Sequence, residues 1–197
     1  KIVGDQAWEI ATVRRWVTDS YEDFQRHRYG LKVETLKFIR TWWTRMADKL
    51  ITNSEYMASS VIQWGIARDK LVVIYNSAKP LTKVQSINMP LETPIKLITV
   101  TRLVPWKRTE GLLHAIAQID YAGLMIIGDG PELNHLQALV DKLAITDRVI
   151  FSGQLNHTDT LSLIAESDIF VLNSSWESFA HVILEAMSLG VPVIATA

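Results

Sequence analysis

Cysteine is absent from this chain of 197 residues. Its absence excludes disulfide cross-links, thiolate metal sites and cysteine nucleophiles. A chain without disulfides suits a reducing compartment. We therefore expect a cytoplasmic protein, working in solution or at the cytoplasmic face of a membrane.

Long hydrophobic runs and an excess of one charge are absent as well. The longest apolar runs, such as 124–127 and 169–172, fall far short of the roughly 18 residues that cross a bilayer. The 20 basic and 21 acidic side chains leave a net charge of −1, which gives no overall attraction to nucleic acid or lipid. We therefore expect no membrane-spanning segment and no nucleic-acid partner.

An initiator methionine and a signal-peptide pattern are missing too. The chain starts at Lys1, and its last residues form the strand-like run V-P-V-I-A-T-A. These ends predict a fragment that is cut on both sides and that folds poorly in isolation.

Short runs of branched apolar residues alternate with helical stretches along the whole chain. Strand–helix–strand repetition predicts an α/β fold of parallel sheets, with right-handed crossovers and helices on both faces. Ser54 is an expected helix N-cap, and Pro131 suits the first turn of a helix over 132–143. The expected strands are 49–52, 71–75, 96–101, 123–127, 148–151, 169–172 and 191–195.

From residue 77 to residue 94 the alternation stops. Three prolines, at 80, 90 and 94, stand among scattered Ser, Thr and Lys residues without a periodic apolar face. We therefore predict a first domain over 1–78, an interdomain linker over 79–94 and a second domain over 95–197.

The clearest helical stretch runs over 34–50. Its buried apolar face is expected from side chains at three- and four-residue steps, namely Leu36, Ile39, Trp43, Met46 and Leu50. A second interpretation is a basic aromatic face for peripheral contact with an anionic membrane, made by Trp42, Trp43, Lys37, Arg40 and Arg45. The alternative to membrane contact is an ordinary core stripe with a solvated rim.

Two cations follow the expected strand at 96–101, in the segment R-L-V-P-W-K-R. In doubly wound sheets, ligands bind outside the carboxyl ends of the strands. Arg102 can bind a diphosphate through the donors of its planar guanidinium, and Lys107 can attract it as a point charge. Taken alone, the pair is equally compatible with two solvated loop cations.

Glycines stand at the ends of the next two expected strands. Gly128 opens G-D-G-P-E, and Gly153 closes V-I-F-S-G. Glycine permits a tight turn and a close backbone approach, although the run lacks the G-x-G-x-x-G spacing of dinucleotide sites. In isolation, a turn that only connects a strand to a helix explains them.

The segment E-S-F-A-H-V-I-L-E places Glu177 on a loop and Glu185 about two turns inside the helix that follows. The amides of Ser178, Phe179 and Ala180 are then expected at the helix N-terminus, where the helix dipole attracts phosphate. One ligand could touch both carboxylates. The alternative is a solvated acidic pair on a surface helix.

The ordered set of these segments resembles the nucleotide-sugar half of GT-B glycosyltransferases, in particular family 4 of the retaining enzymes. The resemblance covers about 97–197, through R-L-V-P-W-K, G-D-G-P-E, F-S-G and E-S-F-A-H-V-I-L-E-A-M-S-L-G-V-P-V-I-A-T. Upstream, A-D-K-L-I-T-N-S-E-Y and V-V-I-Y-N-S look like the end of the family's acceptor domain. The resemblance implies two Rossmann-like parallel-sheet domains, both truncated, in a fragment that is inactive alone.

The resemblance also implies a nucleotide diphosphate sugar as donor and a glycan, lipid-linked or small-molecule acceptor. Arg102 and Lys107 would hold the diphosphate, and Glu185 would bind the ribose hydroxyls. Glu177, with the amides that follow it, would contact the transferred sugar. The remaining implied donor contacts are Gly128, Gly153, Ser178, Phe179 and Ala180.

This chain departs from the family pattern at a few positions. Thr101 and Arg108 stand where the family usually has glycine, and Ala180 with His181 replaces a glycine-containing stretch. The departures concern sugar specificity more than the diphosphate site.

Metal ligands are not evident in the sequence. There is no D-x-D element and no spaced set of His or Cys, so we expect no metal and no other cofactor. His181 and Glu185, four apart on a helix, could alternatively form a metal pair. In the family, the new bond forms with retention and the departing phosphate takes the acceptor's proton, which makes Glu177 a sugar contact rather than a nucleophile.

Two rival functions remain open. A non-catalytic nucleotide-sugar-binding subunit of a glycan-synthesis assembly would keep Arg102, Lys107 and Glu185 yet lack acceptor chemistry. A dinucleotide-dependent oxidoreductase would need the glycine fingerprint and a ribose-binding acid after a first strand, and both are missing.

Overall fold

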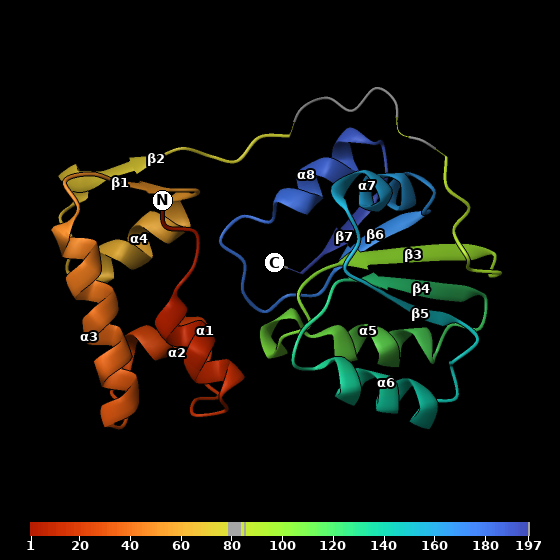
Figure 1. Cartoon of the computed structure of the whole chain (residues 1–197), viewed down its shortest axis with the longest axis horizontal. Coiled ribbons are helices and arrows are strands. Elements are labelled where there is room, and N and C mark those ends of the chain that lie inside the picture. The colour runs from red at the N-terminus through yellow and green to blue at the C-terminus, as the bar shows by residue number, and fades with distance from the viewer. Residues whose placement is uncertain (79–83, 85, 197) are drawn as a thin grey trace. The chain divides into compact units, whose positions relative to one another are not determined.

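The computed structural model describes residues 1–78, 84 and 86–196. The chain forms two units. The N-terminal unit consists of Lys1–Asn76 together with Trp176–Phe179, and the C-terminal unit consists of Ser77–Ser175 together with Ala180–Ala197. Both units combine parallel strands with helices, which confirms the predicted α/β class (Figure 1).

The C-terminal unit contains a sheet of five parallel strands in the order β5-β4-β3-β6-β7. In chain order, β3 forms the centre of the sheet, β4 and β5 follow on one side of it, and β6 and β7 follow on the other side. This reversal creates a switch point between β3 and β6, where a crevice forms outside the strand ends. The strands are β3 (Ile95–Val100), β4 (Ala122–Ile127), β5 (Val149–Gly153), β6 (Ile169–Leu172) and β7 (Val193–Ala195).

Helices cover both faces of this sheet (Figure 1). On one face, α5 (Thr109–Ile116) and α6 (Leu133–Lys142) share an apolar core with the strands. On the other face, α7 (His157–Ala165) and α8 (His181–Ser188) close a second core. Every residue of β4 is buried because both of its faces are covered, which explains why the strand reads as a continuous apolar run.

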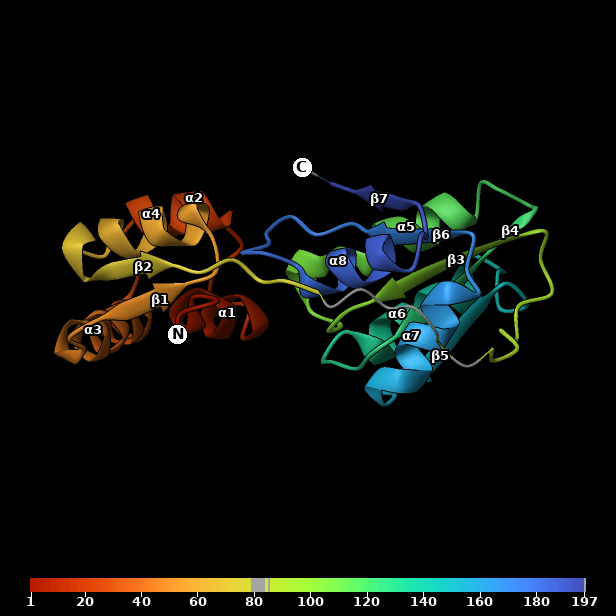
Figure 2. The same ribbon diagram turned by 90° about the horizontal axis from the view of Figure 1, so that it is seen from above.

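The N-terminal unit has two short parallel strands, β1 (Leu50–Thr52) and β2 (Leu71–Val73), and Ile2 extends this sheet by a bridge to Thr52. In Figure 2, α2 and α4 lie on one side of these strands, and α1 and α3 lie on the other. Ser54 caps α4 as expected, accepting a hydrogen bond from the Met57 amide at 3.1 Å. The helices of this unit are α1 (Gln6–Val13), α2 (Tyr21–Arg26), α3 (Leu31–Met46), α4 (Glu55–Gln63) and the 3₁₀ turn η1 (Arg68–Lys70).

The expected helix over 34–50 is wrong in its bounds and in its buried face. The helix α3 starts at Leu31 and ends at Met46, and Leu50 belongs to β1. Trp43 and Met46 are 62% and 61% exposed, whereas Val33 and Thr44 are buried. The apolar stripe therefore faces outward, and the helix packs against α1 through another face.

The predicted basic aromatic face is also corrected. Trp42 and Trp43 are exposed, but Lys37 and Arg40 turn inward. Lys37 donates to the carbonyl oxygens of Phe24 and His27, both at 2.7 Å. Of the three expected cations, only Arg45 stays on the exposed surface, and none of the described helices is long and apolar enough to cross a membrane.

Arg40 turns inward because it pairs with Asp5, which is fully buried. Asp5 also caps α1, accepting from the Ala7 amide at 3.0 Å, and accepts from Gln25 Nε2 at 2.9 Å. Burial lowers the pKa of the Arg40 guanidinium, and the Asp5 carboxylate opposes that shift. This ion pair joins the first helix of the unit to the third.

The expected linker over 79–94 falls partly outside the described residues, at 79–83 and 85. Its described part packs on the C-terminal unit. Met89 and Leu91 are only 2% and 3% exposed and belong to the core under α7 and α8. The two buried side chains make this stretch part of the unit's packing rather than a free connection.

Replacing Asp5 with alanine should destabilise the protein by about 3–5 kcal/mol, because the Arg40 guanidinium is left buried without its counter-charge. Urea unfolding followed by tryptophan fluorescence measures the change. Asp48→Ala, at an exposed aspartate, is the matched control and should change the free energy of unfolding by less than about 0.5 kcal/mol. Equal effects of the two substitutions would contradict the role assigned to the ion pair.

Candidate functional site

The loop after β3 carries both predicted diphosphate ligands, at the switch point of the sheet. Arg102 is exposed at the start of this loop, and Lys107 ends the 3₁₀ turn η2 (Pro105–Lys107). Arg108 follows in the left-handed conformation with φ of 48°, and α5 begins at the next residue. The loop therefore presents its cations outside the carboxyl end of the central strand.

The loop after β6 fastens this turn from the other side of the switch point. The amide and the hydroxyl of Ser175 both donate to the carbonyl oxygen of Trp106, at 2.7 and 3.2 Å. Asn173 Nδ2 donates to the carbonyl oxygen of Arg108 at 2.9 Å. Lys107 is thus flanked by two residues whose backbones are held in place. No local pattern in the sequence predicts these cross-loop bonds, because their partners are 65 and 69 residues apart in the chain.

The glycines of G-D-G-P-E let two loop backbones touch. Gly128 has φ of 134°, and a Cβ built there would lie 1.9 Å from the carbonyl oxygen of Thr101. A Cβ on Gly130 would lie 2.3 Å from the carbonyl oxygen of Leu103. No side chain fits at either position, so the loops after β3 and β4 run in direct backbone contact.

Gly153 meets a different requirement. Its φ of 69° favours glycine, while nothing lies within 4 Å of a Cβ built there. Its carbonyl oxygen accepts a hydrogen bond from the Gly128 amide at 2.9 Å. The two predicted glycines therefore lie next to one another across β4 and β5.

A cavity of about 320 Å³ lies at this edge of the sheet. It brings together the predicted residues Arg102 and Gly128 with side chains from the loops after β4 and β5 and from α7. Residues that the sequence prediction missed complete its lining, namely Val100, Thr101, Ile127, Asp129, Gln154, Leu155 and Thr160. Lys107 and Glu185 are not part of this lining.

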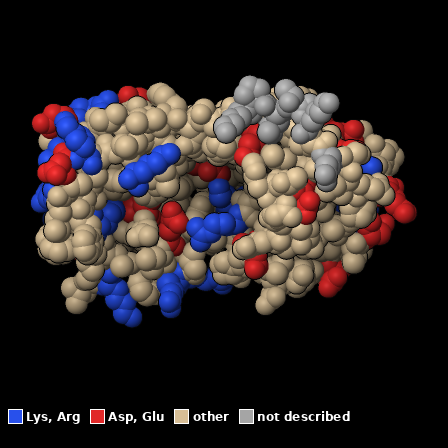
Figure 3. Space-filling view, turned by 45° about the horizontal axis from the view of Figure 1, so that its top comes forward, with Lys and Arg blue, Asp and Glu red and all other residues tan. Residues whose placement is uncertain are grey.

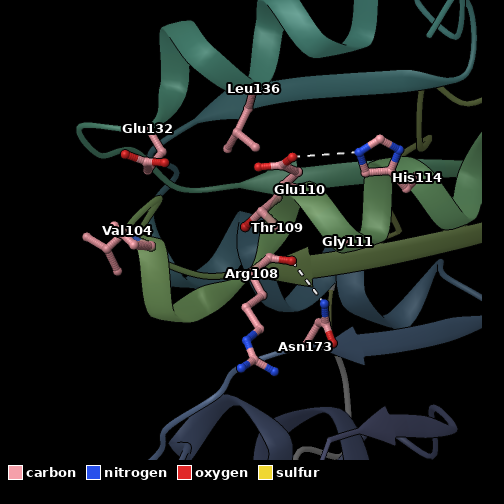
Figure 4. A pocket seen from close by; sticks show the side chains of 10 residues that line it. Val104, Arg108, Thr109, Glu110, Gly111, His114, Glu132, Leu136 and Asn173 are labelled. Carbon is pink, nitrogen blue, oxygen red and sulfur yellow. Dashed lines mark hydrogen bonds and ion pairs between the residues drawn. The ribbon is translucent and has the colours of Figure 1, made fainter. Parts of the chain in front are cut away.

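A larger cavity of about 430 Å³ lies on the other side of the loop after β3 and contains none of the predicted site residues. Figure 4 shows Glu110 and Glu132 at this cavity, with the Arg108 side chain extending away from both. Glu110 is also near His114, at 3.6 Å, and His135, at 3.3 Å.

Glu185 lies on α8, with a side chain that is 13% exposed. Its Oε1 atom is 2.8 Å from His157 Nε2 and 3.2 Å from His181 Nδ1. The expected helix start is corrected here, because α8 begins at His181 after Ala180. Glu185 is therefore little more than one turn inside the helix, and the amides of Ser178 and Phe179 precede it.

Trp176–Phe179 groups with the N-terminal unit instead of with the sheet that carries Arg102. The Trp176 ring packs on Trp8 and Tyr21, with ring centroids 5.3 and 4.7 Å apart. Ser178 Oγ donates to the Val3 carbonyl oxygen at 2.6 Å and accepts from Asn53 Nδ2 at 3.0 Å. The structure thus brings Arg102, Lys107, Gly128, Gly153, Ala180 and Glu185 into one unit, and Glu177, Ser178 and Phe179 into the other.

Two family models match the chain. The model of glycosyl transferases group 1 matches residues 83–197, and that of glycosyltransferase family 4 matches residues 12–79. The chain belongs to the glycosyl transferases group 1 family. The expected resemblance to GT-B glycosyltransferases is thereby confirmed.

Curated relatives carry glycosyltransferase names. The lipopolysaccharide core biosynthesis glycosyltransferase LpsD of Rhizobium meliloti (strain 1021) is 33% identical over 194 residues, which cover 96% of this chain and 54% of the relative. The N-acetyl-alpha-D-glucosaminyl L-malate synthase of Bacillus anthracis is 41% identical over 103 residues, which cover 51% of this chain and 26% of the relative.

Solved structures extend the similarity to the fold. The structure of Anabaena Alr3699/HepE in complex with UDP-glucose has a TM-score of 0.69 and 27% identity, and the match covers 82% of this chain and 48% of that one. Sucrose-phosphate synthase from Thermosynechococcus elongatus has a TM-score of 0.72 and 25% identity, with 94% and 47% covered. The chain spans about half the length of LpsD and of these two structures.

The charge distribution is mixed. On the face drawn in Figure 3, basic and acidic side chains are interspersed over a larger uncharged surface, in keeping with the net charge of −1.

Within the described residues, no group of three or more His, Asp or Glu side chains is arranged to hold a metal ion.

Gly128→Ala should destabilise the protein more than Gly153→Ala. For Gly153→Ala we expect a loss of about 1–2 kcal/mol, from left-handed backbone strain alone. For Gly128→Ala we expect about 3 kcal/mol or more, because the new Cβ would in addition lie 1.9 Å from a carbonyl oxygen that cannot move freely. Urea unfolding of both variants tests the difference, and equal losses would show that the two loops can separate at little cost.

Proposed function

We propose that the full-length protein transfers a sugar from a nucleotide diphosphate sugar to an acceptor, with retention of the anomeric configuration. The acceptor is a glycan, a lipid-linked molecule or a small molecule. The observation that carries this proposal is the pair of cations on the loop after β3, on a turn fastened by Asn173 and Ser175. Relatives named as glycosyltransferases and a similar fold solved with UDP-glucose support it.

Each candidate residue has a defined task in this proposal. Arg102 binds the diphosphate through its fork of donors, and Lys107 adds a second charge. Glu185 accepts hydrogen bonds from the ribose hydroxyls. Gly128 and Gly153 keep the loop backbones close to the donor. The family resemblance alone assigns Glu177, Ser178, Phe179 and Ala180 to the transferred sugar.

The chemistry requires stabilisation of a leaving group. When the bond between the sugar and the diphosphate breaks, the electron pair stays with the phosphate oxygen, and the sugar gains oxocarbenium character. Cations already held in position lower the energy of this charge without reorganisation at the moment of reaction. The departing phosphate then takes the proton of the acceptor hydroxyl, while the new bond forms on the same face of the sugar.

Replacing Arg102 or Lys107 with alanine should weaken binding of the nucleotide diphosphate by about 1.5–3 kcal/mol for each charge-assisted bond lost. Calorimetry with UDP, GDP and ADP on the full-length protein measures this. Arg108→Ala is the matched control, because Arg108 is a cation on the same loop that lines the other cavity. Unchanged affinity in both test variants would remove the diphosphate assignment, and tight binding without any transfer would favour the non-catalytic binding subunit.

Transfer should not depend on a divalent metal. The motivation is that two cations of the chain itself supply the positive charge which a bound metal supplies in other phosphate sites. The full-length enzyme, assayed with excess chelator, should keep its rate. A loss of turnover that added magnesium or manganese restores would overturn this expectation.

A further inference from the structure

Two histidines share one oxygen atom of Glu185. His157 Nε2 lies 2.8 Å and His181 Nδ1 lies 3.2 Å from Glu185 Oε1. The two histidines are the first residues of α7 and α8, so each ring is carried by the start of a different helix. Glu185 Oε2 has no recorded hydrogen-bond partner within the part of the chain that the structure describes. The carboxylate is thus held at one oxygen and open at the other.

The other ring nitrogen of His181 fixes the position of one ring proton. His181 Nε2 lies 2.9 Å from the carbonyl oxygen of Ser77. A carbonyl oxygen can only accept, so Nε2 carries a hydrogen. Nδ1 then donates to Glu185 only when the ring carries a second proton. In that state His181 is a cation that bridges the carboxylate of Glu185 and the backbone at Ser77.

His157 relates this cluster to the cavity that contains Arg102. Thr160 lines that cavity, and it lies three residues after His157 on α7. Residues three apart are neighbours on one face of a helix. The face of α7 that lines the cavity with Thr160 therefore also carries His157, whose ring contacts Glu185.

We propose that His157 and His181 are positioning residues that orient Glu185 for the ribose of the donor. Their hydrogen bonds fix the carboxylate through Oε1 and leave Oε2 to accept from a ribose hydroxyl. The inference rests on the proposed function, which assigns Glu185 to the ribose. A carboxylate held in its binding geometry before the donor arrives loses less conformational freedom on binding, so the effect falls on donor affinity and not on the chemical step.

The test uses the full-length protein and two probes. Calorimetry measures the affinity for pyrophosphate, which has no ribose, and for whichever of UDP, GDP and ADP binds best. The variants are His157→Ala, His181→Ala and their combination. His157→Gln and His181→Asn keep an amide donor near Glu185 and serve as conservative replacements. His135→Ala is the matched control, because it removes a similar histidine–glutamate contact between α5 and α6.

The combined alanine variant should bind the nucleotide about tenfold more weakly and pyrophosphate within about twofold of the wild type. The KM for the donor should rise by a similar factor with little change in kcat. The conservative replacements should recover most of the affinity, and His135→Ala should match the wild type.

Two results would overturn the role proposed for the two histidines and leave the proposed function standing. One is nucleotide affinity that stays within about twofold of the wild type in the combined alanine variant, while Arg102→Ala still weakens it. The other is an equal loss for nucleotide and pyrophosphate, which would indicate a general disturbance of the site. A wild-type protein that binds none of the nucleotides would overturn both this inference and the proposed function.

Discussion

The backbone contact between Gly128 and Thr101 is the constraint on which the cationic loop depends. Beyond the end of β3, the Thr101 amide donates to the carbonyl oxygen of Ile127, the last residue of β4, and the Leu103 amide donates to that of Asp129 in the loop after β4, both at 2.9 Å. The parallel ladder thus continues past the strand ends, and Arg102 lies between the two bonded residues. A side chain at residue 128 would separate these backbones, because its Cβ would lie 1.9 Å from the oxygen of Thr101. The position of Arg102 is therefore set by the absence of a side chain on the adjacent loop.

The position of Lys107, the second cation, depends on the loop after β6, which lies on the other side of β3. Lys107 follows a buried tryptophan whose carbonyl oxygen accepts two bonds from Ser175, and it precedes Arg108, whose carbonyl oxygen accepts from Asn173. One loop of the switch point is thus held by β4 on one side and by the segment after β6 on the other. Fixed loops of this kind limit the reorganisation needed to stabilise developing charge. The fold order β5-β4-β3-β6-β7 matters for function because it places these two neighbours on either side of β3.

The sequence predicted the strands well because a parallel strand covered on both faces must be apolar throughout, as β4 is. It could not predict which face of α3 is buried. Periodicity reports that apolar side chains share a stripe, but the inward turn of Arg40 is decided by a buried carboxylate 35 residues away in sequence, at Asp5. The packing of Trp176 on Trp8 and Tyr21 is likewise decided by partners that are far away in the sequence. A local pattern carries no information about such long-range partners, whereas the cations and glycines at strand ends are fixed by the chain order itself.

Cavity size alone points to the side of the loop opposite the proposed diphosphate site. The cavity of about 430 Å³ exposes Glu110 and Glu132, and Arg108 extends away from both (Figure 4). Two unit charges about 4 Å apart interact by about 4 kcal/mol in surroundings typical of a protein surface, so a diphosphate beside a carboxylate would meet strong repulsion. The cavity of about 320 Å³ is smaller, and its charged lining residues are one cation, Arg102, and one carboxylate, Asp129. Under the proposed function, the smaller cavity is the better candidate for the diphosphate, because one carboxylate, Asp129, lines it against two in the larger cavity, and because it contains Arg102.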